Sequence, residues 1–119
     1  MYNYNMREKL KNLIGNMVYG IVDRPLGSCH PKHIDMVYEV NYGFIPEMMA
    51  RDGEYQDAYF LGSDIPLIDF QGVVIAIIHR LNDIEDKLVV APIGKDYSKE
   101  EIEAQVHFQE KYFKHIIIK

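Results

Sequence analysis

The chain has 119 residues, of which 48% are hydrophobic and 26% are charged, a balance typical of one globular domain spanning residues 1–119. The formal net charge of −5 and the absence of a long basic run argue against nucleic acid or an anionic membrane as a partner. The single cysteine, Cys29, excludes an intrachain disulfide and a thiolate zinc cluster.

The first half of the chain predicts short elements separated by irregular segments. These elements are a helix over 7–14 and strands over 17–22, 37–44 and 58–61. Gly15 ends the helix, and Pro31 lies in an irregular segment before the second strand. Gly43 permits a close backbone approach within that strand.

The second half predicts a hairpin, a helix and a last strand. The hairpin joins a β-branched strand over 72–81 to a strand over 87–91, and the last strand covers 115–118. The helix begins at Ser98, which forms a capping box with Glu101. Its inward stripe is expected to consist of Ile102, Val106, Gln109 and Phe113. Several short strands and one late helix predict a mainly β, α+β fold: a small antiparallel barrel with the C-terminal helix packed on it.

The N-terminal segment lacks the apolar core of a signal peptide, and the longest apolar run, 73–78, is too short to span a bilayer. A cytoplasmic location is therefore expected. A chain this short buries only about two thirds of its unfolded surface, and its end, 116–118, is apolar. These features favour a homo-oligomer.

Two acidic clusters are candidates for a functional site. The first, 52–57, contains Asp52, Glu54 and Asp57, and the second, 83–86, lies in the hairpin turn. Carboxylates massed in this way suit Mg²⁺, which takes hard oxygen ligands. Solvated polar turns are the simpler interpretation of each cluster alone.

Residue types that bind phosphate accompany the acids. Lysines 32, 87 and 114 can act as point charges, and Tyr42 and Tyr112 can donate hydrogen bonds. The same lysines could instead form ion pairs, and the tyrosines could simply pack. His30 and His33 lack a third ligand for zinc, and His79 is expected to be a core residue.

Four motifs follow one another in a distinctive order. They are YEVNYGFI at 38–45, DGEYQD at 52–57, EDKLVVAP at 85–92 and VHFQEKY at 106–112. An Asn-Tyr-Gly-aromatic strand, an acidic stretch, an acid-x-Lys-Leu-Val strand and a terminal helix bearing a tyrosine resemble soluble family I inorganic pyrophosphatase. The similarity covers residues 18–114, most of the chain.

The resemblance implies a five-stranded barrel of OB type with the active site at its mouth. It also implies a magnesium-dependent inorganic diphosphatase that hydrolyses diphosphate to two phosphates, with Mn²⁺ as an alternative cofactor. Matched by position, the implied metal ligands are Asp52, Asp57, Asp83 and Glu85, with Asp86 as the alternative to Glu85. Glu54 stands where the family has an aspartate that helps to activate the attacking water.

The remaining matched residues would hold phosphate groups. These are Tyr42 and Lys87 at the reaction centre, together with Lys32 and Tyr112. The chain lacks a hairpin that supplies an arginine in the family, and Arg24 is the expected replacement. Phe113 occupies the position of a helix lysine, so Lys114 is expected to substitute for it.

Two other functions remain open from the sequence. One is hydrolysis of another phosphoanhydride or a phosphoester with the same metals. The other is a non-catalytic phosphate-binding homologue.

Overall fold

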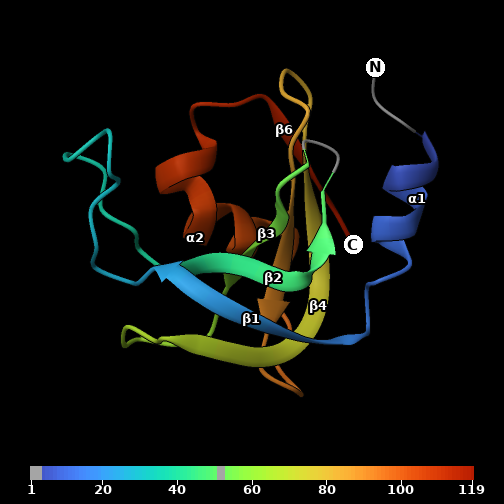
Figure 1. Ribbon diagram of the computed structural model, residues 1–119, viewed down its shortest axis with the longest axis horizontal. Coiled ribbons are helices and arrows are strands. Elements are labelled where there is room, and N and C mark those ends of the chain that lie inside the picture. The colour runs from blue at the N-terminus through green and yellow to red at the C-terminus, as the bar shows by residue number, and fades with distance from the viewer. Residues whose placement is uncertain (1–3, 51–52) are drawn as a thin grey trace.

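The computed structural model describes residues 4–50 and 53–119, with side chains from residue 8 onward (Figure 1). Two helices and six strands lie within these residues. In chain order they are α1 (Tyr4–Lys11), β1 (Met17–Arg24), β2 (Asn41–Met49), β3 (Tyr55–Phe60), β4 (Asp69–Arg80), β5 (Asp86–Ala91), α2 (Lys99–Glu110) and β6 (His115–Ile118). None of the helices in this part of the chain is long and apolar enough to cross a membrane.

The strands form a barrel because the first strand pairs with the long fourth strand. The order is β1-β2-β3-β5-β4, closed by β1–β4 pairing, and β6 adds to the far end of β4. This confirms the predicted five-stranded, OB-like barrel with a packed C-terminal helix. The expectation that every pair is antiparallel was wrong, because β3 and β5 are parallel, with Ala58 opposite Leu88.

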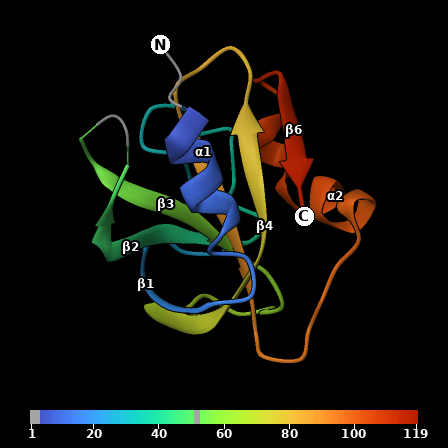
Figure 2. The same ribbon diagram turned by 90° about the vertical axis from the view of Figure 1, so that its right-hand side faces the viewer.

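Alternating side chains of β5 build two hydrophobic clusters, because successive residues of a strand point to opposite faces. Leu88 and Val90 belong to the cluster that also contains Leu10 of α1. Val89 and Ala91 belong to the cluster that contains Ile102 and Val106 of α2. Figures 1 and 2 show α1 and α2 lying apart on the barrel. β5 is therefore covered on both faces.

The capping box of α2 is confirmed. The Ser98 hydroxyl accepts a hydrogen bond from the Glu101 amide at 3.1 Å, and the Ser98 amide donates to the Glu101 carboxylate at 2.8 Å. Ile102, Val106 and Gln109 are buried as predicted. Placing Phe113 on the helix was wrong, since α2 ends at Glu110.

The first helix and the second strand begin elsewhere than predicted, and the other strands except β6 differ from prediction by one to three residues at one or both ends. The helix expected over 7–14 lies at Tyr4–Lys11, and hydrogen-bonded turns continue to Gly15 at φ 99°. The second strand begins at residue 41 rather than 37. Residues 37–40 are irregular, and Val37 forms only an isolated bridge to Cys29. Tyr38 and Val40 of this segment pack into the core, and this produces the alternating pattern that predicted a strand.

At Gly43 the backbones of β1 and β2 approach closely. A Cβ atom there would lie 1.8 Å from the Ile21 carbonyl oxygen, which belongs to the backbone and cannot rotate away. We expect Gly43→Ala to lower the free energy of unfolding by about 3 kcal/mol or more, measured by urea denaturation.

The matched control is Gly15→Ala, where open space surrounds the site and only the positive φ opposes a side chain. Its expected cost is about 1 kcal/mol. Equal losses of unfolding free energy for the two substitutions would show that the close backbone contact at Gly43 does not exclude a side chain.

Candidate functional site

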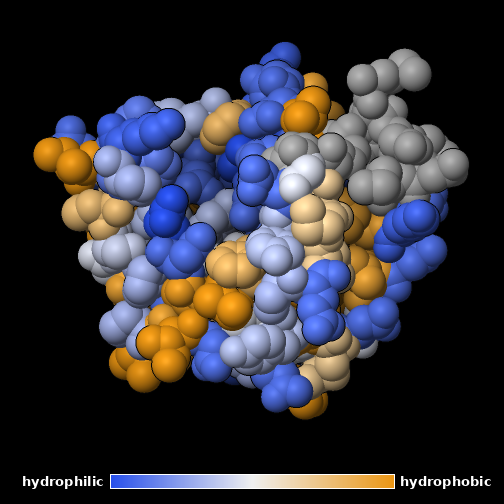
Figure 3. Space-filling view, in the orientation of Figure 1, coloured by the Kyte–Doolittle hydropathy of each residue, from blue (hydrophilic) through white to orange (hydrophobic). Residues whose placement is uncertain are grey.

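A hollow of about 870 Å³ lies at the mouth of the barrel. Its walls come from the end of β1, the segment 30–38, strands β2 to β5 and the residues around the end of α2. The surface between the segment 30–38 and the β4–β5 turn is mainly hydrophilic (Figure 3). A polar hollow that several elements share is a suitable place for a small charged ligand.

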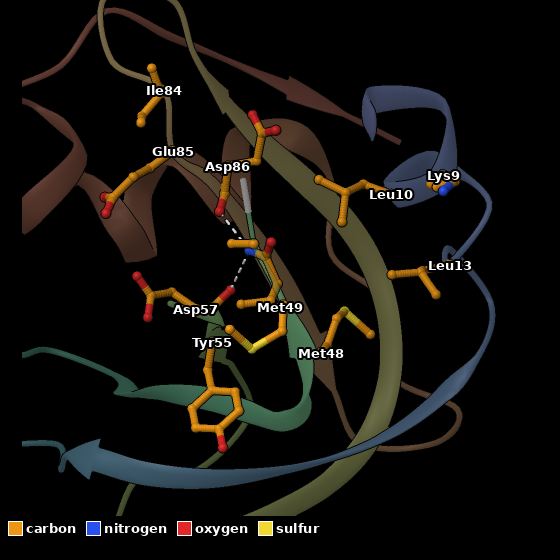
Figure 4. Close-up of a pocket in the computed structure, with 12 residues that line it drawn as sticks. Lys9, Leu10, Leu13, Met48, Met49, Tyr55, Asp57, Ile84, Glu85 and Asp86 are labelled. Atoms are coloured by element: carbon orange, nitrogen blue, oxygen red, sulfur yellow. Dashed lines mark hydrogen bonds between the residues drawn. The ribbon is translucent and has the colours of Figure 1, made fainter. Parts of the chain in front are cut away.

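Lys87 lines this hollow and lies between the two acidic clusters. Its ammonium donates to the Asp57 carboxylate at 2.6 Å and to the Glu85 carboxylate at 2.8 Å. The Lys87 side chain is 3% exposed, whereas Asp57 and Glu85 are 33% and 32% exposed. In Figure 4 the two carboxylates lie on the same side of the strands. The predicted meeting of two separate acidic segments is therefore observed at Asp57 and Glu85.

Arg80, at the end of β4, is a second buried cation that sequence reasoning missed. Its guanidinium binds Glu110 through two bonds, Nε–Oε1 at 3.0 Å and Nη2–Oε2 at 2.7 Å. Its Nη1 atom donates to Glu85 at 3.1 Å and to Asp83 at 3.4 Å. The Phe113 ring lies 3.6 Å from the guanidinium carbon, a cation–π contact. The sequence feature that could have identified Arg80 is a charged residue at the end of a long apolar strand.

A buried hydrogen-bond chain holds Glu110 in turn. The Tyr59 hydroxyl donates to Glu110 at 2.7 Å and accepts from Gln109 at 2.6 Å. The Tyr38 hydroxyl donates to Gln109 at 2.9 Å. These contacts link α2 to the barrel and give each of these polar groups at least one partner, which favours a rigid network.

Protonation states in the site follow from burial and neighbours. Burial opposes the charge of Arg80, but the hydrogen bonds and charge of Glu110 raise its pKa above the ordinary value. Burial also opposes the charge of Glu110, and the Arg80 hydrogen bonds outweigh it and lower the pKa of Glu110. Burial, followed by the charge of Asp57, raises the pKa of Tyr42, so its hydroxyl keeps its proton. Tyr42 is consequently a neutral donor beside Lys87, whose ammonium lies 5.6 Å from the tyrosine ring centre.

The structure brings most of the predicted phosphate-binding residues to this hollow. Arg24, Lys32, Tyr42, Lys87 and Tyr112 all line it, although Tyr112 is 65% exposed. Lys114 is exposed and does not line it.

The hollow also includes Arg80, which was given no role from sequence. Asp23, His30 and His33 line it as well. The His30 Nδ1 atom accepts a hydrogen bond from the Lys32 amide at 3.0 Å, so the ring proton lies on Nε2 when His30 is neutral.

The other predicted acids lie elsewhere. Glu54 is exposed outside the hollow, and Asp83 faces Arg80. Asp86 is buried, with its carboxylate 2.6 Å from His79 Nδ1. In Figure 4 the Asp86 carboxylate lies apart from those of Glu85 and Asp57, beside a smaller pocket of about 310 Å³ that α1 partly covers.

The last predicted ligand, Asp52, lies outside the described residues. Of the two alternatives in the hairpin turn, Glu85 faces the hollow and Asp86 does not.

A divalent cation such as Mg²⁺ needs oxygen ligands that lie close together. Within residues 4–50 and 53–119, no three His, Cys, Asp or Glu side chains gather closely enough to form a metal cluster. Asp57 and Glu85 do present two partly exposed carboxylates side by side. Their chemistry fits Mg²⁺, which uses one or two protein carboxylates and keeps several waters.

The fold resembles that of solved inorganic pyrophosphatases. No protein-family model and no curated protein matches the sequence. Solved structures do match. One is an inorganic pyrophosphatase from Ehrlichia chaffeensis, with a TM-score of 0.65, 19% identity, and coverage of 86% of this chain and 84% of that one.

Two further inorganic pyrophosphatases give similar values. The protein from Coxiella burnetii has a TM-score of 0.62 and 19% identity, over 87% of this chain and 84% of that one. The protein from Neisseria gonorrhoeae has a TM-score of 0.61 and 21% identity, over 82% and 74%. At these identities the likeness establishes the fold alone.

The Arg80–Glu110 pair should dominate the stability of the site. Arg80→Met leaves the Glu110 carboxylate buried without its cation, so we expect a loss of about 3–5 kcal/mol in the free energy of unfolding. The double variant Arg80→Met/Glu110→Gln removes both charges, and it should recover most of that loss. Urea denaturation measures both values, and a double variant as unstable as the single one would contradict this account.

The same pair predicts a pH dependence. The pKa of Glu110 is lowered from 4.5 in the folded chain, so the pair contributes fully above pH 4.5 and loses its contribution as the pH falls through the lowered value. Below pH 4.5 the difference in unfolding free energy between wild type and Arg80→Met/Glu110→Gln should therefore shift in favour of the variant. A difference that stays constant down to pH 2.5 would contradict the prediction.

Proposed function

We propose that this chain is a magnesium-dependent inorganic diphosphatase. The observation that carries the proposal is that Asp57, on β3, and Glu85, in the β4–β5 turn, converge on the Lys87 ammonium inside a hollow that Arg24 and Lys32 also line. The likeness of the fold to inorganic pyrophosphatases supports the same reaction. Two of the motifs that resemble family I enzymes, 52–57 and 85–92, contain Asp57, Glu85 and Lys87.

The reaction adds water across one phosphorus–oxygen bond. The water oxygen bonds to one phosphorus, the bond from that phosphorus to the bridging oxygen breaks, and the bridging oxygen leaves with the second phosphate. Asp57 and Glu85 would hold Mg²⁺, which when bound supplies a water of lowered pKa and offsets negative charge on the substrate. Mn²⁺ is the alternative ion.

The chain's own groups bind and orient the substrate. Lys87 and Tyr42 stabilise charge that develops on the leaving oxygen, the lysine as a cation and the tyrosine as a neutral donor. Arg24 and Lys32 attract the phosphate oxygens at the other wall of the hollow.

A carboxylate must accept the proton of the attacking water. Desolvation raises the pKa of Asp23, which lines the hollow, although the charge of Arg24 opposes the shift. A raised pKa makes Asp23 a better proton acceptor than an ordinary aspartate. Glu54, outside the hollow, has no part in this proposal.

Two specific observations favour other functions. The hollow, at about 870 Å³, is large enough for a ligand such as a nucleotide or a sugar phosphate, which favours a hydrolase of a larger phosphoanhydride or phosphoester. The pairing of Asp57 and Glu85 with buried cations favours a phosphate-binding homologue without catalysis. A cytoplasmic location and a homo-oligomer stay predictions.

Phosphate release separates these functions. Wild-type protein should release phosphate from diphosphate with Mg²⁺ and not with a chelator, and Asp57→Asn should lower kcat by about 100-fold or more. The control is Asp64→Asn, an exposed carboxylate outside the hollow that should leave the rate unchanged.

A panel of nucleotides and sugar phosphates tests the alternatives in the same assay. If only one of these compounds is hydrolysed, that compound replaces diphosphate as the proposed substrate. Phosphate binding without turnover of any compound would contradict an enzymatic function.

A further inference from the structure

Two protein cations bridge the carboxylates of the site. The Lys87 ammonium joins Asp57 to Glu85, at 2.6 and 2.8 Å. The Arg80 Nη1 atom joins Glu85 to Asp83, at 3.1 and 3.4 Å. Both cations bind the same oxygen of Glu85, Oε2. A cation between two carboxylates offsets the repulsion that a divalent ion would otherwise have to neutralise.

Arg80 cannot easily leave this position. Its side chain is 4% exposed, and the Glu110 carboxylate that holds it through two bonds is 0% exposed. Phe113 covers one face of the guanidinium at 3.6 Å. Moving Arg80 toward solvent would leave Glu110 charged and buried without a partner, which is costly.

We propose that Arg80 is a positioning residue that permanently occupies the place between Asp83 and Glu85 where a second divalent ion would bind. The site then takes one divalent ion, on the side of Asp57 and Glu85, and Asp83 is a partner of Arg80 rather than a metal ligand. Lys87 also lies between Asp57 and Glu85, but these partners are 33% and 32% exposed, whereas Arg80 is held by a fully buried carboxylate, so an ion can displace the Lys87 contacts from the solvent side. This inference rests on the proposed metal-dependent function.

The local charge balance is consistent with a single ion. The described carboxylates that these cations contact are Asp57, Asp83, Glu85 and Glu110. Four carboxylates and two cations leave a formal charge of −2, which one divalent ion balances. A second divalent ion would leave excess positive charge beside two buried cations. Only an ion that arrives with the negatively charged substrate would avoid this excess.

Mn²⁺ binding in the absence of substrate tests the proposal, with electron paramagnetic resonance or calorimetry reporting the number of ions per chain. Wild type should bind one ion, and Asp57→Asn should weaken this binding at least tenfold. Asp83→Asn should change the affinity by less than threefold.

The double variant Arg80→Met/Glu110→Gln provides the complementary test, because it frees Asp83 and Glu85 without leaving a buried charge unpaired. It should bind two ions, and adding Asp83→Asn to it should restore one. Circular dichroism and urea denaturation establish that each variant is folded before its metal content is measured. Should the double variant fail to fold, the conservative Arg80→Lys, which keeps the charge, should still bind one ion.

Three results would overturn the inference: two or more ions bound to wild type at this site, a loss of affinity in Asp83→Asn equal to that in Asp57→Asn, or no bound ion. The phosphate-release assay keeps this test separate from the proposed function. Turnover of diphosphate by wild type with two bound ions would contradict the proposed role of Arg80 but not the proposed activity. One bound ion without turnover of diphosphate would contradict the proposed activity but not the role of Arg80.

Discussion

The ammonium of Lys87, lying 2.6 Å from Asp57 and 2.8 Å from Glu85, is the contact on which the arrangement of the site depends. Two carboxylates this close repel each other unless a cation lies between them. The parallel pairing of β3 with β5 sets their separation, because it places Asp57 beside the start of β5. Gln56 reinforces this pairing, since its side-chain amide donates to the backbone carbonyls of Asp57 and Asp86 at 3.0 and 2.6 Å. The barrel therefore gathers charge at its mouth through backbone geometry.

A second layer of contacts connects this centre to helix α2. Arg80 links Glu85 to the buried Glu110, and the tyrosines of the barrel complete the hydrogen-bond chain. The helix thus contributes more than apolar side chains, since its last turn supplies the counter-ion that holds a cation in the hollow. A fixed, desolvated arrangement of charge costs little reorganisation when a phosphate compound binds, which is the property expected of a preorganised anion site.

Much of the fold could be predicted from the sequence, because local patterns report local structure. The capping box at Ser98 and the β-branched run before Arg80 were sufficient for α2 and β4. The parallel β3–β5 pair could not be predicted, since it joins strands separated by the whole of β4. The two acidic clusters were found from composition, and the choice of Glu85 over Asp86 required the direction in which each side chain of the turn points. Arg80 was missed because its role depends on Glu110 and Phe113, which lie thirty or more residues away in the chain.

Phosphate chemistry is the central claim of the proposed function, in which Asp57 and Glu85 would bring a divalent ion to the substrate. A crystal structure with Mn²⁺ and phosphate, using the anomalous scattering of manganese, tests this most directly. We expect one anomalous peak within coordination distance of both carboxylates, with phosphate on the side of Arg24 and Lys32. Manganese found only outside the hollow, while Lys87 keeps both carboxylates, would contradict this claim.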